Sequence, residues 1–384
     1  MGIPESLAYF LENAANPKGL LKKYKAAGKK VIGVMPYHIP EELIFAAGMI
    51  PMGLWGNNNK MINRAKEYSP TFYCSLVQLD LEMLLDGTLE DLDGVITATM
   101  CDTLRPMSQN IKTVVKDKFP MIFVAHAQNR FGTAGKEYTI YQNNKIKKEL
   151  EKIGNCEITN DAIKEAIRVY NASRAARREF TRLAGEHPEV ISAVARGAVL
   201  KAGWFLPKDE YTEKLQALNA ELDALPQSQW RGTRVVTSGI ICDNRQLLQI
   251  FDDNNIAVGA DDVSHESRAF RVDVPEIDDD AMVCLAEQFA RQDHDPMLYD
   301  CRPAEKRRVT FLQELAKNNN AQGVVIFMMQ FCDPEETDYP YVKDGLNELG
   351  IPHIRLGLDQ QMRDFGQMST SLQAFSTVLE QTLK

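Results

Sequence analysis

Three cysteines lie where predicted strands and helices meet, and their thiols suit a metal centre. Cys74 lies near the start of a helix expected at about 71–85, while Cys101 and Cys332 come just after apolar segments that are typical of buried strands. In an α/β fold such joints expose loop residues at the edge of the sheet, where three thiols from separate loops could converge. Thiolates are the usual ligands of iron–sulfur clusters, so an iron–sulfur cluster is the leading candidate.

The spacing of the cysteines leaves a second interpretation open. The separations of 27 and 231 residues match no local zinc or ferredoxin pattern, and the chain has no Cys-x-x-Cys pair. Free cysteines are often small buried hydrophobes. Position favours the ligand interpretation, because a helix N-terminus stabilises a thiolate. Cys242 follows a predicted strand and is a weaker fourth candidate. Cys284 suits the core side of a helix, and Cys156 and Cys301 lie in polar connections.

Other polar residues form weaker candidate sites. His38 and His126 follow predicted strand ends, and a role in lining a site is weighed equally against a structural role. Asp261 and Asp262 follow a strand expected at 256–260, where a solvated loop is the simpler interpretation. The glutamates at 335–336 more simply open the helix after a proline than form a catalytic pair. No zinc-type histidine pair and no phosphate-binding glycine fingerprint is found.

Composition and charge exclude several classes of protein. The 384 residues are 44% hydrophobic and 25% charged, which is typical of globular domains. A net charge of −9 with no outweighing basic stripe argues against a nucleic-acid partner. Seven cysteines without a compact framework do not predict a disulfide scaffold. With no signal-peptide pattern and no apolar stretch of membrane-spanning length, we expect a cytoplasmic protein with no membrane contact.

The order of predicted elements indicates an α/β protein. Apolar strands alternate with helices in two blocks, which predicts two doubly wound parallel sheets of the Rossmann or flavodoxin-like kind. Between the blocks lie three helical patterns and no convincing strand, a region that could wrap the first domain or contact another subunit. We therefore expect an N-terminal α/β domain at 1–159, a helical region at 160–230 and a C-terminal α/β domain at 231–384.

Three stretches of sequence resemble a known family. Residues 33–51 (GVMPYHIPEELIFAAGMIP), 101–110 (CDTLRPMSQN) and 327–336 (FMMQFCDPEE) are similar to the signatures of the 2-hydroxyacyl-CoA dehydratase and benzoyl-CoA reductase family. The resemblance covers essentially the whole chain. Segments 157–163 and 363–367 resemble the β-type subunits of that family in particular.

The resemblance implies cofactors and partners. It implies a [4Fe–4S] cluster between two α/β domains, with Cys74, Cys101 and Cys332 at the ligand positions and a non-cysteine ligand on the fourth iron. FMN or another flavin accompanies some members. The implied partners are a related α subunit in a heterodimer, an ATP-dependent iron–sulfur activator protein and an acyl-CoA substrate. The implied reaction is radical dehydration of a 2-hydroxyacyl-CoA.

Two alternatives to this function are kept. Within the family, the chain could be a subunit of a benzoyl-CoA-type reductase, which consumes its electrons instead of recycling them. Outside that chemistry, it could be a scaffold subunit that is metal-free or binds zinc. Iron and sulfide analysis separates a cluster protein from the scaffold, and the stoichiometry of electrons to product separates the reductase from the dehydratase.

Overall fold

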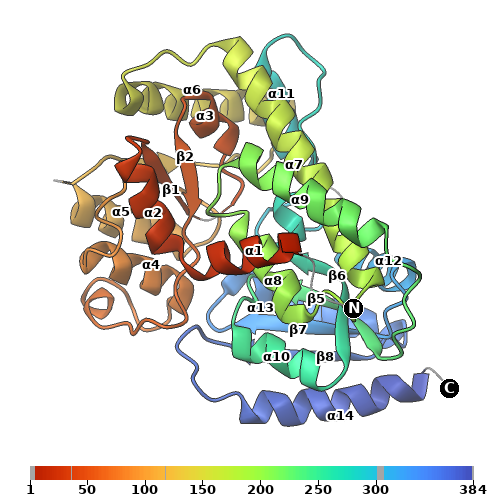
Figure 1. Ribbon diagram of the computed structural model, residues 1–384. Coiled ribbons are helices and arrows are strands. Elements are labelled where there is room, and N and C mark those ends of the chain that lie inside the picture. The colour runs from red at the N-terminus through yellow and green to blue at the C-terminus, as the bar shows by residue number, and fades with distance from the viewer. Residues whose placement is uncertain (1–4, 36, 117, 301–306, 383–384) are drawn as a thin grey trace.

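The computed structural model describes residues 5–35, 37–116, 118–300 and 307–382 (Figure 1). Two parallel sheets dominate it, one built from each end of the chain, with long helices between them. In Figure 1 the first sheet lies above the second, and α14 (Gly366–Thr382) runs along the outside of the second sheet.

The first sheet has four parallel strands in the order β2-β1-β3-β4. The strands are β1 (Val31–Met35), β2 (Ile50–Gly53), β3 (Gly94–Ala98) and β4 (Met121–Val124). Every residue of β1, β2 and β3 is buried, because helices cover both faces of the sheet. The helices of this part are α1 (Glu5–Ala15), α2 (Pro17–Ala26), α3 (Glu41–Ala46), α4 (Ser75–Leu85), α5 (Leu104–Val115) and α6 (Thr133–Gly154).

The second sheet repeats this topology with the order β6-β5-β7-β8. Its strands, again all parallel, are β5 (Thr233–Gly239), β6 (Ile256–Val263), β7 (Gly323–Met329) and β8 (His353–Leu358). The helices around it, besides α14, are α10 (Arg245–Asp253), α12 (Arg307–Asn318) and α13 (Asp333–Glu348). Helix α11 (Ala281–Arg291) instead packs against α6 and α7. The prediction of two doubly wound parallel sheets is therefore confirmed.

Alternating side chains of β7 build the two cores of the second sheet. Val325 and Phe327 pack with residues of α10 and α14 on one face. Val324 and Ile326 pack with residues of α12 and α13 on the other. The period of two in a strand separates the faces, and the apolar run is unbroken because both faces are covered.

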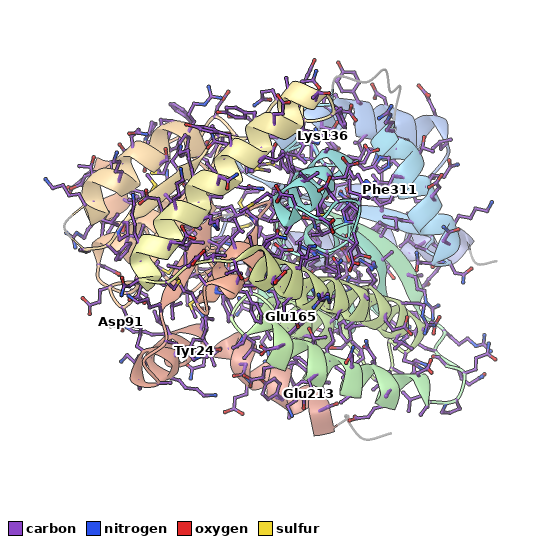
Figure 2. All side chains as sticks on the ribbon, turned by 90° about the horizontal axis from the view of Figure 1, so that it is seen from above. Tyr24, Asp91, Lys136, Glu165, Glu213 and Phe311 are labelled. Atoms are coloured by element: carbon purple, nitrogen blue, oxygen red, sulfur yellow. The ribbon has the colours of Figure 1, made fainter. Side chains whose placement is uncertain are left out.

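Three helices occupy the middle of the chain, as expected. They are α7 (Asn160–Glu186), α8 (Ala193–Ala202) and α9 (Lys208–Asp223), and a side-chain oxygen caps two of them, Thr159 for α7 and Ser192 for α8. Helix α7 packs against α3 of the first part and β6 of the second, so the helical region joins both sheets instead of wrapping only the first. Seen from above, Glu165 and Glu213 mark the neighbouring helices α7 and α9 (Figure 2). The domain boundaries themselves stay a prediction.

Two elements differ from the sequence expectation in ways that matter for the site. Helix α4 begins at Ser75, four residues later than expected, and Cys74 has extended backbone angles as its N-cap residue. Strand β6 continues to Val263, so Asp261 and Asp262 lie inside the sheet and are buried. The expectation of a solvated loop at these two aspartates is wrong, and the apolar Val263 just beyond them was the signal that the strand continues.

Candidate iron–sulfur site

Each of the three predicted ligand cysteines lies at the start of a helix. Cys74 directly precedes α4, and Cys332 directly precedes α13 after β7. Cys101 lies between β3 and α5. The residue before Cys332, Phe331, has a positive φ of 63°, a conformation that is rare for a bulky side chain. This turn reverses the chain between β7 and α13 and directs it into the helix at the cysteine.

The structure brings Cys74, Cys101 and Cys332 to the wall of one cavity, called the cysteine cavity here. The rest of its wall is largely apolar and includes Tyr37, Trp55, Ile240, Met297, Met329 and Phe331. An apolar wall limits the access of water to a metal centre and so influences its reduction potential. Cys101 and Cys332, which are 231 positions apart in the chain, thus line the same cavity.

The cysteine cavity lies where the carboxyl ends of the two sheets face each other. Its wall takes Tyr37 and Cys101 from the loops after β1 and β3, which are neighbours in the first sheet. It takes Ile240 and Cys332 from the loops after β5 and β7, which are neighbours in the second. In each sheet the strand order reverses between these two strands, which is the usual place for a ligand in a doubly wound fold.

Backbone amides point toward all three thiols. The N–H groups in the first turn of α4 lower the pKa of the Cys74 thiol, and those at the starts of α5 and α13 lower the pKa of Cys101 and Cys332. Burial is nevertheless the largest influence and raises the pKa of the Cys74 thiol to about 12. Burial also raises the pKa of Cys101 and, more strongly, of Cys332. Without a cation the thiols would stay protonated, whereas bound iron would replace the protons and the amides would then bond to thiolate sulfur.

The donor set fits a cluster better than a single ion. Among residues 5–35, 37–116, 118–300 and 307–382, no group of three or more His, Cys, Asp or Glu side chains is arranged to hold one metal ion. A four-iron cluster instead takes each thiolate on a different iron, so its ligand sulfurs lie farther apart. Three thiols, amide donors and an apolar wall therefore suit a cluster, although the ligand role itself stays a prediction.

His38 and His126 do not line the cysteine cavity. Both line a second cavity between α6, α7 and α11, called the basic cavity here, whose wall also includes Glu41, Arg174, Arg177 and Lys208. His38 has a φ of +61° and its Nε2 lies 2.9 Å from Asp295. The ring of His126 stacks on Phe289 with centroids 4.6 Å apart. Burial lowers the pKa of His126 to about 3, with smaller contributions from His38 and Arg130, so its ring is neutral.

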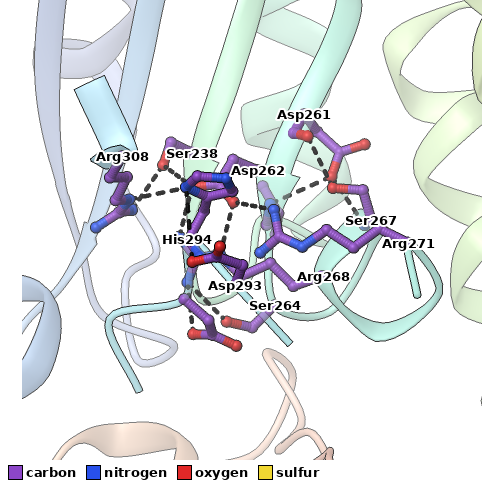
Figure 3. A network of polar contacts seen from close by, with 12 residues as sticks. Ser238, Asp261, Asp262, Ser264, Ser267, Arg268, Arg271, Asp293, His294 and Arg308 are labelled. Atoms are coloured by element: carbon purple, nitrogen blue, oxygen red, sulfur yellow. Dashed lines mark hydrogen bonds and ion pairs between the residues drawn. The ribbon is translucent and has the colours of Figure 1, made fainter. Parts of the chain in front are cut away.

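A network of charges, which the sequence did not reveal, surrounds Asp262 (Figure 3). The carboxylate of Asp262 accepts from Arg268 at 2.9 Å, from Arg308 at 3.1 Å and from Arg271 at 3.1 Å. Arg268 and Arg308 also bind Glu335 at 2.7 and 2.9 Å. Glu335 is in the first turn of α13, so the network anchors the helix that begins at Cys332.

The other cysteines lie away from the predicted ligands. Cys242, the weaker fourth candidate, packs in the core of the second sheet and is not in the wall of the cysteine cavity. Cys284 is buried in the main core on α11, as expected. Cys156 is exposed. Cys301 lies outside the described residues.

Comparison with known proteins identifies the family of this chain. Residues 36–379 match the family described as 2-hydroxyglutaryl-CoA dehydratase, D-component. The chain belongs to this family. The match covers the second sheet, the first sheet apart from β1, and all three cysteines of the cavity.

Several relatives are similar to this chain along most or all of their length. The chain is 52% identical over 379 residues to the β subunit of (R)-2-hydroxyglutaryl-CoA dehydratase of Acidaminococcus fermentans, covering 99% of this chain and 100% of that protein. It is 41% identical to the β subunit of (R)-phenyllactyl-CoA dehydratase of Clostridium sporogenes, covering 96% and 97%. One of the subunits of benzoyl-CoA reductase of Thauera aromatica is 26% identical, with 85% and 84% covered.

The described residues of this family member contain no candidate membrane span. No helix there is both long enough and apolar enough to cross a bilayer.

Proposed function

We propose that this chain is the β subunit of a radical dehydratase that converts (R)-2-hydroxyglutaryl-CoA to glutaconyl-CoA and water. The single observation that carries the proposal is the 52% identity, over the whole of its length, to the β subunit of the Acidaminococcus enzyme. The relatives that act on phenyllactyl-CoA and lactoyl-CoA are less similar, at 41% and 37% identity. We therefore propose 2-hydroxyglutaryl-CoA, rather than another 2-hydroxyacyl-CoA, as the substrate.

The reaction needs an electron because neither bond to be broken is activated. Hydroxide must leave the carbon next to the thioester carbonyl, and a proton must leave the β carbon, which is not acidic. One electron added to the carbonyl gives a ketyl radical anion on the substrate, which can expel the α-hydroxide. The remaining enoxy radical has an acidic β proton. Loss of that proton and return of the electron give the enoyl-CoA, so the products are glutaconyl-CoA and water with no net oxidation.

We propose that Cys74, Cys101 and Cys332 hold a [4Fe–4S] cluster in the cysteine cavity, with a non-cysteine ligand on the fourth iron. When bound, such a cluster supplies one-electron chemistry at low potential. The residues of this chain then have three tasks. The thiols bind the irons, the amides of the helix starts stabilise the sulfur charge, and the apolar side chains around Trp55 and Met329 exclude water.

The proposal includes partners that the chain needs for turnover. A related α subunit forms a heterodimer with it and binds most of the acyl-CoA, and a separate ATP-hydrolysing iron–sulfur protein delivers the activating electron. A flavin such as FMN is a further candidate cofactor, with no residues assigned to it. A cytoplasmic location belongs to the proposal because a reducing compartment keeps such thiols free, and the six described cysteines form no disulfide.

A benzoyl-CoA-type reductase component is the second candidate, favoured by the similarity to the Thauera reductase. Electron stoichiometry separates the two. The chain, purified anaerobically with its partner subunit and activator, should form many molecules of glutaconyl-CoA for each activating electron. Consumption of electrons in proportion to product would support the reductase instead. Absence of iron and sulfide from the anaerobic protein would support the scaffold alternative.

A further inference from the structure

The basic cavity contains more buried cations than buried anions. Its wall includes the cations Arg174, Arg177 and Lys208 and the carboxylates Glu41 and Glu42. Arg174 forms an ion pair with Glu42, and the Lys208 Nζ lies 3.2 Å from Glu41. These two pairs account for both carboxylates and leave Arg177 without a counter-charge of its own.

Arg177 is buried without an acidic partner. Its side chain belongs to a residue that is 6% exposed, and no described acid lies within ion-pair distance of its guanidinium. Its Nε donates one long bond of 3.4 Å to the Ser173 carbonyl, and the guanidinium lies 4.9 Å from the centre of the Phe270 ring. Burying a charge that has no partner is costly, and burial accordingly lowers the pKa of Arg177. An anion in the cavity would remove that cost.

Neutral polar groups in the same wall could complete an anion site. The Nε2 atom of His126 is buried and has no hydrogen-bond partner among the described residues. The carboxamide of Asn143 also lines the cavity. Such groups can donate hydrogen bonds to an oxyanion without adding charge. The cation that lacks an acidic partner and the histidine whose Nε2 lacks a hydrogen bond therefore line the same cavity.

The space suits a ligand of only a few atoms. About 70 Å³ is available to the centre of a water-sized sphere. A single water needs about 10–15 Å³ by that measure, so there is room for several waters or one compact anion. A nucleotide or an acyl-CoA is too large for this space.

We propose that the basic cavity binds a compact oxyanion, either a small carboxylate or inorganic phosphate, with Arg177 as its counter-ion. The site is separate from the cysteine cavity and requires neither a cluster nor turnover. The inference therefore goes beyond the dehydratase proposal and can fail independently of it.

Thermal unfolding of the full-length chain tests the site. Acetate and phosphate are compared with chloride at equal ionic strength, and affinities are measured by calorimetric titration. At least one of the two oxyanions should raise the unfolding temperature in a saturable way, because a ligand that binds only the folded state stabilises it. Acetate alone would identify a carboxylate site and phosphate alone a phosphate site. No effect of either beyond that of chloride would overturn the proposal.

Variants of Arg177 show whether the binding is at this site. Arg177→Met should weaken binding at least tenfold. Arg178→Met is the matched control, because Arg178 is the next residue on α7 but is partly exposed and paired with Asp273 at 2.8 Å. Arg178→Met should bind the anion as the wild type does. If Arg177→Met does not fold, Arg177→Lys keeps the charge and should weaken binding severalfold, since lysine lacks the planar fork. Wild-type affinity in whichever Arg177 variant folds would overturn the assignment.

Discussion

The hydroxyl of Tyr37 donates a hydrogen bond of 2.6 Å to the carboxylate of Asp295, and this bond holds the tyrosine in the wall between the two cavities. Tyr37 lines both the cysteine cavity and the basic cavity. The same Asp295 oxygen lies 2.9 Å from His38 Nε2, and Arg268 approaches its other oxygen at 3.6 Å. The wall between the two cavities is therefore held by the buried charge network that also anchors the start of α13.

Removing the hydroxyl of Tyr37 tests this contact. Tyr37→Phe keeps the ring in both walls but loses the bond to Asp295, so we expect the free energy of unfolding to fall by about 1.5–3 kcal/mol, as for a hydrogen bond to a charged group. Urea unfolding measures the change. Iron content should stay at the wild-type level, because the ring still closes the cysteine cavity. A stability equal to that of the wild type would show that the bond has no net effect.

Replacing the predicted ligands tests the cluster. Cys74→Ser, Cys101→Ser and Cys332→Ser should each lower the iron and sulfide content and reduce dehydratase activity at least tenfold. The matched control is Cys284→Ala, a buried cysteine in the main core, which should lose about 1 kcal/mol of stability through a small packing defect and keep its iron. Metal analysis after anaerobic purification is the measurement. Wild-type iron in all three serine variants would refute the ligand assignment.

The buried carboxyl of Asp80 predicts a dependence of stability on pH. One oxygen accepts the Gly56 N–H at 2.8 Å, the other has no partner among the described residues, and burial raises the pKa to about 8. In the unfolded chain this carboxyl ionises near pH 3.8, so between about pH 4 and pH 8 the folded state holds the extra proton. The contribution of Asp80 to stability must therefore fall as the pH rises through that range.

Asp80→Asn removes this dependence while keeping an oxygen for Gly56. We expect the variant to be more stable than the wild type by about 1–3 kcal/mol at pH 8, and the difference to shrink toward pH 4. Denaturant unfolding across this pH range measures it. The control is the exposed Asp91, whose change to Asn should leave the profile unchanged. A difference between wild type and Asp80→Asn that is constant with pH would contradict the burial argument.

Neutralising Asp262 tests the charge network. Its contacts with Arg268 and Arg308 are buried and its contact with Arg271 is partly buried, so Asp262→Asn should lower the free energy of unfolding by about 3–5 kcal/mol at pH 7. The pair of Asp273 with Arg178 is matched in chemistry but partly exposed, and Asp273→Asn should cost about 0–1 kcal/mol. Urea midpoints of the two variants give the comparison. Equal losses of stability in the two variants would mean that burial does not determine how much these ion pairs contribute to the free energy of unfolding.

The Asp262 carboxylate also predicts how the stability of the protein changes at acidic pH. The surrounding arginines hold the pKa of Asp262 well below its usual value, against the opposing effect of burial. Its contribution is therefore complete above the unfolded pKa near 3.8 and is lost as the pH falls below it. Wild type should lose stability faster than Asp262→Asn on acidification below pH 4, as monitored by circular dichroism.

Local patterns in the sequence determined the parts of the fold that depend on neighbouring residues. Apolar runs such as 94–98 predicted buried parallel strands, and the position of Cys101 just after that run predicted a loop at the sheet edge. Helix signals are equally local, so Pro334 correctly indicated the start of α13. These local strand and helix patterns were enough to mark the cysteines as candidate ligands.

Only the tertiary structure decided which of these loops meet. The distance between Cys101 and Cys332 depends on how two sheets and three middle helices pack, and no local pattern encodes contacts over such a separation. The same holds for charge: Asp262 resembles a surface aspartate in sequence, but arginines that follow it by 6 and 46 residues allow it to be buried. A charged side chain is buried only where distant partners compensate it, and that compensation exists only in the folded chain.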